Sequence, residues 1–390
     1  MQRFEPPQRI LMGPGPSDVH PRVTAALARP TIGHLDPEFV RMMDEVKEGL
    51  RAAFQTGNAM TFPISAPGSA GMEACFVNLV EPGDSVVVCQ NGAFGGRMQQ
   101  NVERAGGTPV MVTAEWGKPI DICKVEKTLK AMPKAKILAF VHAETSTGVE
   151  NNAKDLCALA QKYDCLSIVD AVTSVGGIPV KVDDWQADAV YSGTQKCLSC
   201  PPGLSPITFS TRALDVVKNR KTKVQSWFLD LNLLMGYWEG DGARTYHHTA
   251  PVNALYGLHE ALLMLLEEGL EASWTRHERM HQALVAGLEA MGLELLVDPQ
   301  YRLPQLNAVM IPDGIDEARV RQRLLSTYNI ELGAGLGTLA GKVWRIGLMG
   351  QSASLTNVMM CLGALENTLA TLQAPIQTGR ALSAAEEALE

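Results

Sequence analysis

A chain of 390 residues is too long for one ordinary hydrophobic core, and its length predicts two domains. Apolar residues make up 46% of the sequence and charged residues 19%, which is typical of a globular chain and excludes a disordered one. The formal net charge of −8 argues against a general affinity for nucleic acid or for an anionic membrane.

The beginning of the chain and its cysteines predict a compartment. The first residues contain no apolar signal-peptide core, and no uninterrupted apolar stretch is long enough to cross a bilayer. Eight cysteines are scattered along the sequence, and several lie in apolar runs, as small buried residues of a reducing compartment do. Cys197 and Cys200 have no second CxxC pair or histidine pair, so we expect no metal site. The cytoplasm is the expected location.

The first two thirds of the chain predict a mainly parallel sheet. Residues 1–20 hold four prolines and two glycines between Pro6 and Pro16, and we expect an extended arm there. Apolar β-rich runs then alternate with helical periods, which indicates a seven-stranded sheet between helices. The predicted strands are Met60–Ser65, Ser85–Cys89, Pro109–Thr113, Ile137–Val141, Leu166–Val169, Ala189–Ser192 and Ser205–Ser210. The predicted helices are Ala70–Leu79, Ala93–Ala105, Lys124–Met132 and Ala153–Tyr163.

The pattern changes after residue 250. A long helical region, from Pro251 to about Met291, precedes predicted strands and helices that interleave. The strands are Leu293–Val297, Asn307–Ile311 and Val343–Ile346, and the helices are Glu317–Leu325 and Leu355–Leu372. We therefore predict an arm (1–20), a large domain (21–255), a smaller α+β domain (256–372) and a tail without assigned role (373–390).

Reactive side chains directly follow three of the predicted strands. Asp170 follows Leu166–Val169, Lys196 follows Ala189–Ser192, and Glu144, Thr145 and Ser146 follow Ile137–Val141. In open α/β sheets, ligands bind at the carboxyl ends of the strands. These side chains are thus the candidates for a site.

A lysine at one strand end and an aspartate at another fit the chemistry of pyridoxal phosphate. The lysine amine forms an imine with the cofactor aldehyde, and a carboxylate that faces the pyridine nitrogen keeps the ring protonated and electron-withdrawing. The phosphate needs N–H groups at a helix start, and Gly68, Ser69 and Ala70 follow a strand and begin a helix. Each piece alone has an ordinary interpretation, as a capping aspartate, a surface lysine or a turn; their order and context favour the cofactor site.

At these residues the chain resembles the class V aminotransferases, and most closely the alanine–glyoxylate (serine–pyruvate) group. The resemblance covers nearly the whole chain. Its motifs are GPGPS (13–17), GHLDPEF (33–39), MDEVKEGL (43–50), NLVEPGDSVVV (78–88), HAETSTGV (142–149), VDAVTSVGG (169–177), YSGTQKCLSCPPG (191–203), RTYHHTAPV (244–252) and GKVWRIGLMG (341–350).

The resemblance implies a fold-type I homodimer with active sites at the subunit interface. By position in its motifs, Lys196 is the Schiff-base lysine and proton shuttle, and Asp170 pairs with the ring nitrogen. Further contacts to the cofactor fall on Gly68, Ser69, Ala70, Phe94, Thr145, Val172 and Gln195, and, toward the phosphate of the neighbouring subunit, Tyr246 and Thr249. Arg345 and Gly15 fall on the substrate side, where a guanidinium suits the α-carboxylate.

Two departures affect the cofactor contacts. The turn has Pro67, Ser69 and Ala70 where the animal enzymes have Ser/Gly-His-Cys-like residues, and a proline donates no N–H. Phe94 replaces the frequent tryptophan, which keeps the stacking and loses an indole donor. Adjacent His247 and His248 are expected to point apart and to lie near the interface.

The expected reaction is a ping-pong transamination from L-alanine or L-serine to glyoxylate, or to pyruvate. A sibling activity with ureidoglycine or pyridoxamine as donor stays open, because a small pocket discriminates weakly between similar groups. Cysteine desulfuration would need a mobile cysteine in the C-terminal half, where only Cys361 occurs beyond residue 200, in a helical run. A catalytically silent binding protein would have no chemical need for Lys196 and Asp170.

Overall fold

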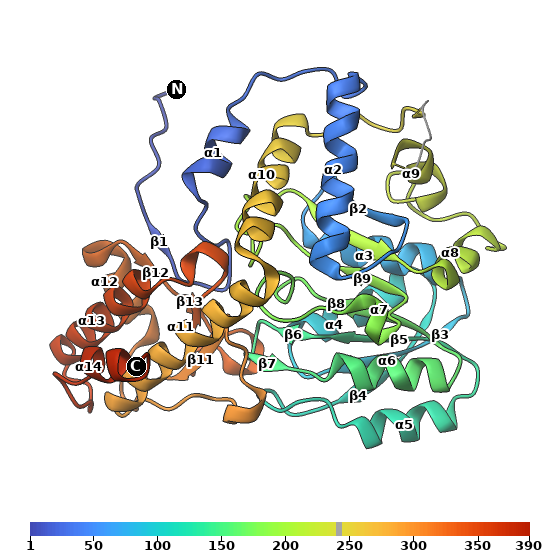
Figure 1. The fold of residues 1–390 in the computed structure, drawn as a ribbon. Helices are drawn as coiled ribbons and strands as arrows, with labels where there is room; N and C mark the ends of the chain where they lie inside the picture. The colour runs from blue at the N-terminus through green and yellow to red at the C-terminus, as the bar shows by residue number, and fades with distance from the viewer. Residues whose placement is uncertain (239–243) are drawn as a thin grey trace.

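A seven-stranded sheet forms the centre of the larger part of the molecule in the computed structural model, which describes residues 1–238 and 244–390 (Figure 1). The strand order is β2-β10-β9-β8-β5-β3-β4, and only β10 runs antiparallel to its neighbours. The strands span Met60–Ile64 (β2), Ser85–Gln90 (β3), Thr108–Thr113 (β4), Ala135–Val141 (β5), Leu166–Asp170 (β8), Ala189–Tyr191 (β9) and Ser205–Phe209 (β10). Every residue of β2, β8, β9 and β10 is buried, so helices cover both faces of the sheet. The predicted mainly parallel, seven-stranded α/β sheet is confirmed.

The helices of this part follow the predicted periods with small shifts. They are α1 (Pro21–Leu27), α2 (Pro37–Phe54), α3 (Gly68–Leu79), α4 (Ala93–Arg104), α5 (Ile122–Ala131), α6 (Ala153–Lys162), α7 (Val182–Trp185), α8 (Thr211–Lys218) and α9 (Leu231–Trp238). Helix α2 is not among the elements predicted above, although Asp36 caps its start and Pro37 occupies its first turn.

The long helical region after residue 250 is two helices. α10 (Val252–Glu268) and α11 (Leu270–Ala290) are separated by Gly269, whose φ is +89°. A glycine adopts this conformation without steric cost, so the chain turns there instead of continuing as one helix. α12 (Glu317–Tyr328), α13 (Leu355–Thr371) and α14 (Ala381–Glu387) complete the C-terminal part.

A small antiparallel sheet accompanies these helices, in the order β11-β14-β13. Its strands span Leu306–Met310 (β11), Gly333–Ala334 (β13) and Val343–Gly347 (β14). The predicted strand Leu293–Val297 is wrong, because Leu295 makes only an isolated bridge to Val309. Directly afterwards the chain turns away through a 3-10 helix at Pro299–Tyr301.

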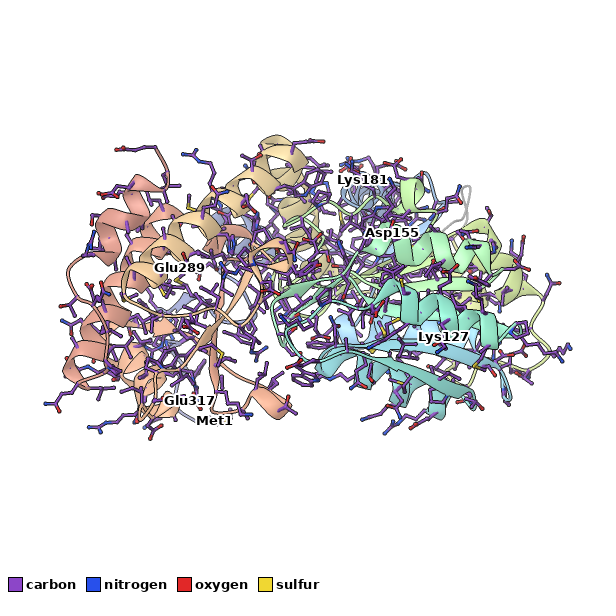
Figure 2. All side chains as sticks on the ribbon, turned by 90° about the horizontal axis from the view of Figure 1, so that it is seen from below. Met1, Lys127, Asp155, Lys181, Glu289 and Glu317 are labelled. Atoms are coloured by element: carbon purple, nitrogen blue, oxygen red, sulfur yellow. The ribbon has the colours of Figure 1, made fainter. Side chains whose placement is uncertain are left out.

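Two hydrophobic cores organise the chain. One gathers residues between Val23 and Leu265, and the other combines Met12 with residues between Met280 and Ala385. In Figure 2, Lys127 and Asp155 lie over the first part and Glu289 over the second, and all three side chains are exposed. The division at residues 20, 255 and 372 stays a prediction.

The two ends of the chain dock on the C-terminal part. Strand β1 (Ile10–Leu11) pairs in parallel with β12 (Ile330–Glu331), and helix α14 packs on α11 and α13 (Figure 1). Another two-stranded sheet, β6 (Ala143–Glu144) with β7 (Val149–Glu150), forms a hairpin after β5. Among residues 1–238 and 244–390, no helix is long and apolar enough to cross a membrane.

Candidate active site

The predicted reactive residues meet at one edge of the central sheet. His142, just after β5, donates its backbone N–H to Asp170 O (2.9 Å), and Ala171 donates to Tyr191 O (2.9 Å), so the ends of β5, β8 and β9 lie side by side. A cavity of about 170 Å³ opens there. Eight of the predicted site residues line it: Gly68, Ser69, Phe94, Thr145, Asp170, Val172, Gln195 and Lys196.

Asp170 is buried and held by two hydrogen bonds. Its Oδ1 accepts from Val172 N (2.9 Å), and its Oδ2 accepts from the Tyr191 hydroxyl (2.8 Å). Burial raises the pKa of Asp170 to about 6, while these hydrogen bonds and the charge of Lys196 act in the opposite direction. A cation placed against Asp170 would therefore stabilise the ionised form of a carboxylate that water does not reach.

Lys196 has an amine that loses its proton close to neutral pH. Desolvation, together with the positive charge of Arg345, lowers its pKa to about 8. Its Nζ donates a hydrogen bond to Pro14 O in the N-terminal arm. The next residue, Gly15, has a φ of +102°, which favours glycine, and it passes so close that a Cβ there would lie 2.7 Å from Nζ.

The turn between β2 and α3 faces the same cavity. Helix α3 begins at Gly68, and the first N–H groups of a helix have no acceptor within it. Gly68 and Ser69 therefore offer donors to an anion. Ala70 does not line the cavity, and its N–H donates to Pro67 O (2.7 Å). In contrast to Gly68 and Ser69, Ala70 therefore does not offer its N–H to an anion in the cavity.

Arg345 reaches the site from β14. Its Nη1 donates to Thr145 O (3.2 Å) and its Nε to Ala334 O (2.7 Å). In the described part of the chain, Nη2 makes no hydrogen bond, so one edge of the guanidinium stays available. Burial lowers the pKa of Arg345 to about 10, at which it is still charged near neutrality.

The residues present fit pyridoxal phosphate. The side-chain oxygen of Gln195, Oε1, is buried and has no hydrogen-bond partner among the described residues, so it calls for a donor. Asp170 offers a carboxylate to a protonated ring nitrogen, the α3 start offers N–H groups to a phosphate, and Phe94 and Val172 offer apolar surfaces to a planar ring. No three His, Cys, Asp or Glu side chains within residues 1–238 and 244–390 are grouped to hold a metal ion.

Five residues predicted to contact the cofactor or the substrate line no part of this cavity: Gly15, Ala70 and Arg345, which lie beside residues that do, and Tyr246 and Thr249. Tyr246 has 62% of its surface exposed, and Thr249 is exposed as well. Their role toward a neighbouring subunit stays a prediction. The expectation that His247 and His248 point apart is wrong: their Nδ1 atoms are 2.8 Å from each other, because the backbone there is not extended as a strand. His248 Nε2 also lies 2.7 Å from Ser65 Oγ, beside the turn that precedes α3.

Sequence reasoning did not find Tyr191 and Arg97, which line the cavity, and it named Glu144 only as a candidate at a strand end, without a task. Tyr191, at the end of β9, bonds to Asp170 on the adjacent strand. Arg97 lies one helical turn after Phe94 with its guanidinium 4.8 Å from the centre of that ring. Glu144 is fully buried beside the predicted Thr145. The spacing of three residues between Phe94 and Arg97 on one predicted helix is a signal that could have found Arg97.

A lysine and an aspartate at neighbouring strand ends, over a cavity with a helix start for a phosphate, define a pyridoxal-phosphate enzyme of fold type I. Residues 19–353 match the family Aminotransferase class-V, and the chain belongs to this family. It is an aminotransferase, and pyridoxal 5′-phosphate is its cofactor.

Among similar proteins, the (S)-ureidoglycine–glyoxylate transaminase of Bacillus subtilis is 40% identical over 98% of this chain and 96% of its own. A solved ureidoglycine–glyoxylate aminotransferase from Bacillus subtilis covers 99% of both chains at 41% identity, with a TM-score of 0.97. A solved alanine–glyoxylate aminotransferase from Nostoc sp. is 45% identical, with a TM-score of 0.92 over 95% of this chain and 97% of its own.

Proposed function

We propose that this aminotransferase moves an amino group from L-alanine or L-serine to glyoxylate, with pyruvate as the second acceptor. The observation that carries the proposal is the position of the Arg345 guanidinium, which is bonded to Thr145 O in the cavity wall and is close enough to Lys196 to lower the pKa of its amine. Such a position suits a substrate with a carboxylate next to its reacting carbon. The ureidoglycine and alanine aminotransferases that it resembles at 40% identity or more are both named for glyoxylate, which supports glyoxylate as the acceptor. A pyridoxamine–pyruvate aminotransferase at 28% identity supports pyruvate as the second acceptor.

Each residue has a proposed task. Bound pyridoxal phosphate supplies an electron sink that stabilises negative charge at the substrate α-carbon. Lys196 carries the proton between that carbon and the cofactor C4′, and its lowered pKa leaves part of the amine free to accept it. Asp170 holds the ring nitrogen, and Arg345 binds the substrate carboxylate through its open Nη2 edge.

The remaining residues orient the cofactor. Of the residues that line the cavity, Phe94 and Val172 would cover the ring, Gly68 and Ser69 would bind the phosphate, and Thr145 and Gln195 would contact the polar groups of the cofactor. Gly15 brings the arm against Lys196 and limits the room beside it. We further propose a homodimer in which Tyr246 and Thr249 of each chain reach the phosphate of the other; their exposure supports this.

An alternative is a sibling activity with ureidoglycine as donor, which the 40% identity to the Bacillus subtilis transaminase favours. Pyridoxamine as donor is the other sibling. Desulfuration is disfavoured, because Cys361 is fully buried within α13 in the second core, where burial raises the pKa of its thiol to about 12.

Half-reactions test the proposal. The purified holoenzyme is mixed with L-alanine, L-serine, ureidoglycine or pyridoxamine without acceptor, and the long-wavelength absorbance of the bound cofactor is followed. We expect fast loss with alanine or serine, and return of the band most efficiently with glyoxylate. Loss with ureidoglycine or pyridoxamine alone would overturn the proposed donor and establish the sibling activity.

Lys196→Ala is the matched control for this experiment. It should abolish the lysine-dependent absorbance and lower turnover by about 10⁴-fold or more, because the variant loses both the attachment point and the proton carrier. Unchanged turnover in this variant would contradict the role of Lys196.

A further inference from the structure

A fully buried carboxylate stands behind the cofactor cavity without a task in the mechanism above. Glu144 ends the short strand β6, and its side chain is inaccessible to solvent. Its Oε1 accepts hydrogen bonds from Ser146 Oγ (2.6 Å) and Ser146 N (3.0 Å), and its Oε2 accepts from Phe94 N (3.3 Å). Every one of these donors lies in the cavity wall or beside a residue that does.

Glu144 and Ser146 together cap a helix that belongs to another part of the chain. Helix α4 begins at Ala93 after Gly92, which has no side chain to cap it. Ser146 Oγ accepts from Ala93 N (2.9 Å), and Glu144 accepts from Phe94 N, so the two cap bonds come from the β6–β7 hairpin. A Cβ on Gly92 would lie 2.3 Å from Glu144 Cδ, which accounts for the glycine at the capping position.

This cap joins two walls of the cavity. Phe94 lies on α4 and Thr145 lies between Glu144 and Ser146, and both line the cavity. Thr145 also accepts the hydrogen bond from Arg345 Nη1. Fixing the hairpin against α4 therefore fixes the aromatic ring relative to the arginine.

We propose that Glu144 is a positioning residue of the transamination site, whose carboxylate fixes the start of α4 and thereby holds the ring of Phe94 against the bound cofactor. The inference rests on the proposed placement of the cofactor against Phe94. It does not depend on which amino donor the enzyme uses.

The charges around Glu144 make this cap sensitive to pH. Burial raises the pKa of Glu144 to about 7, and the negative charge of Asp170 on β8 acts in the same direction. The hydrogen bonds from Ser146 and Phe94 oppose this rise. Arg345 on β14 and Tyr191 on β9 are the other titratable groups that interact with it electrostatically. Below this pH the carboxyl group takes up a proton and accepts hydrogen bonds less well, so cofactor binding should weaken as the pH falls through about 7.

A double-mutant cycle on cofactor affinity tests the proposal. The variants are Glu144→Gln, Phe94→Leu and the double variant, and the dissociation constant of pyridoxal phosphate is measured by titrating each apoenzyme. Each single change should raise the dissociation constant roughly tenfold. The dissociation constant of the double variant should not exceed that of the single variant that binds the cofactor more weakly, since both changes act through the same ring. Glu150→Gln is the control, because Glu150 lies opposite Ala143 in the same hairpin and is partly exposed.

Additive effects of Glu144→Gln and Phe94→Leu would overturn the proposal, because they would show that Glu144 does not act through Phe94. The proposal would be supported if the affinity for pyridoxal phosphate still falls below about pH 7 in Glu150→Gln and no longer falls there in Glu144→Gln. If Glu144→Gln does not fold, Ser146→Ala removes the other cap bond and keeps the charge; an unchanged dissociation constant there would also overturn it. Because no amino donor is present, a failure of the proposed donor reaction would leave these results interpretable.

Discussion

At the scale of single residues, a phenol supports the ionisation of Asp170 together with the backbone N–H of Val172. The Tyr191 hydroxyl donates to Asp170 Oδ2, and both side chains are buried. Hydrogen bonds to the charged form of a carboxyl group favour ionisation, whereas burial disfavours it. Tyr191 therefore keeps Asp170 in the form that can pair with a protonated pyridine.

Replacing Tyr191 by Phe should raise the pKa of Asp170 above its value of about 6, because the opposing hydrogen bond is lost. As the pH is lowered, the variant should then lose activity at a higher pH than the unchanged enzyme, because its Asp170 takes up a proton earlier. We expect the acid limb of kcat/KM to move upward by about one pH unit, and kcat near pH 7 to fall several-fold. The measurement is the pH profile of both enzymes between pH 5 and 9. An acid limb at the same pH would contradict the role of Tyr191.

At the scale of elements, helix α4 approaches strand β3 more closely than a side chain allows. A Cβ at Gly95 would lie 2.6 Å from Cys89 O, a backbone atom that cannot turn aside. A Cβ at the neighbouring Gly96 would meet Gln90 Nε2 at 3.0 Å, the end of a flexible side chain. The two adjacent glycines thus differ in what surrounds them.

Gly95→Ala should push α4 away from the sheet and lower the free energy of unfolding by about 1–3 kcal/mol, the usual cost of overpacking. It should also weaken pyridoxal-phosphate binding, because Phe94 lies on the same helix. Gly96→Ala is the matched control and should be neutral or slightly stabilising, since alanine favours helix. Chemical denaturation of both apoenzymes measures the difference, and equal stability of the two variants would refute the close contact.

The elements also show how far sequence reasoning reaches. The seven strands could be predicted, because strands such as Leu166–Asp170 are apolar on both faces and turn residues bound them. The break at Gly269 and the single bridge at Leu295 could not, because tertiary contacts decide where a periodic pattern ends. The cavity brought together Thr145, Asp170 and Lys196, which were predicted from strand ends. Its lining does not include the predicted Gly15, Ala70, Tyr246, Thr249 and Arg345. It includes Tyr191, whose contact with Asp170 arises from the pairing of β8 with β9 and could not be read from the sequence.

At the scale of the whole molecule, the tail forms part of the second core. Ala381 and Ala385 of α14 are fully buried against this core, and Ala381 O lies 2.9 Å from the position of a Cβ on Gly287 in α11. The next residue, Leu382, is 40% exposed. The tail is therefore a structural helix of the C-terminal part, although its sequence pattern is weak.

Ala381→Asp would bury a carboxylate in this apolar contact and should lower the free energy of unfolding by about 3 kcal/mol or more, because a charged group is costly to remove from water. Leu382→Asp changes an exposed neighbour and should cost less than about 1 kcal/mol. Thermal unfolding of both variants, with the dissociation constant of pyridoxal phosphate as a second readout, tests this. We expect that constant to stay unchanged in both, and similar melting temperatures would contradict the docking of α14.

The pairing of β1 with β12 has a consequence for how the protein is made. Arg9, next to β1, bonds to Asn329, 320 residues further along the chain, and Pro14 and Gly15 of the same arm lie against Lys196. On a ribosome, that distance corresponds to a delay on the order of tens of seconds between the emergence of the arm and that of its partner. During this interval, the strands before Asp170 and Lys196 emerge while β12, the strand that pairs with β1 of the arm, is still missing. The active site is thus closed by one of the first segments synthesised, in one of the last steps of folding.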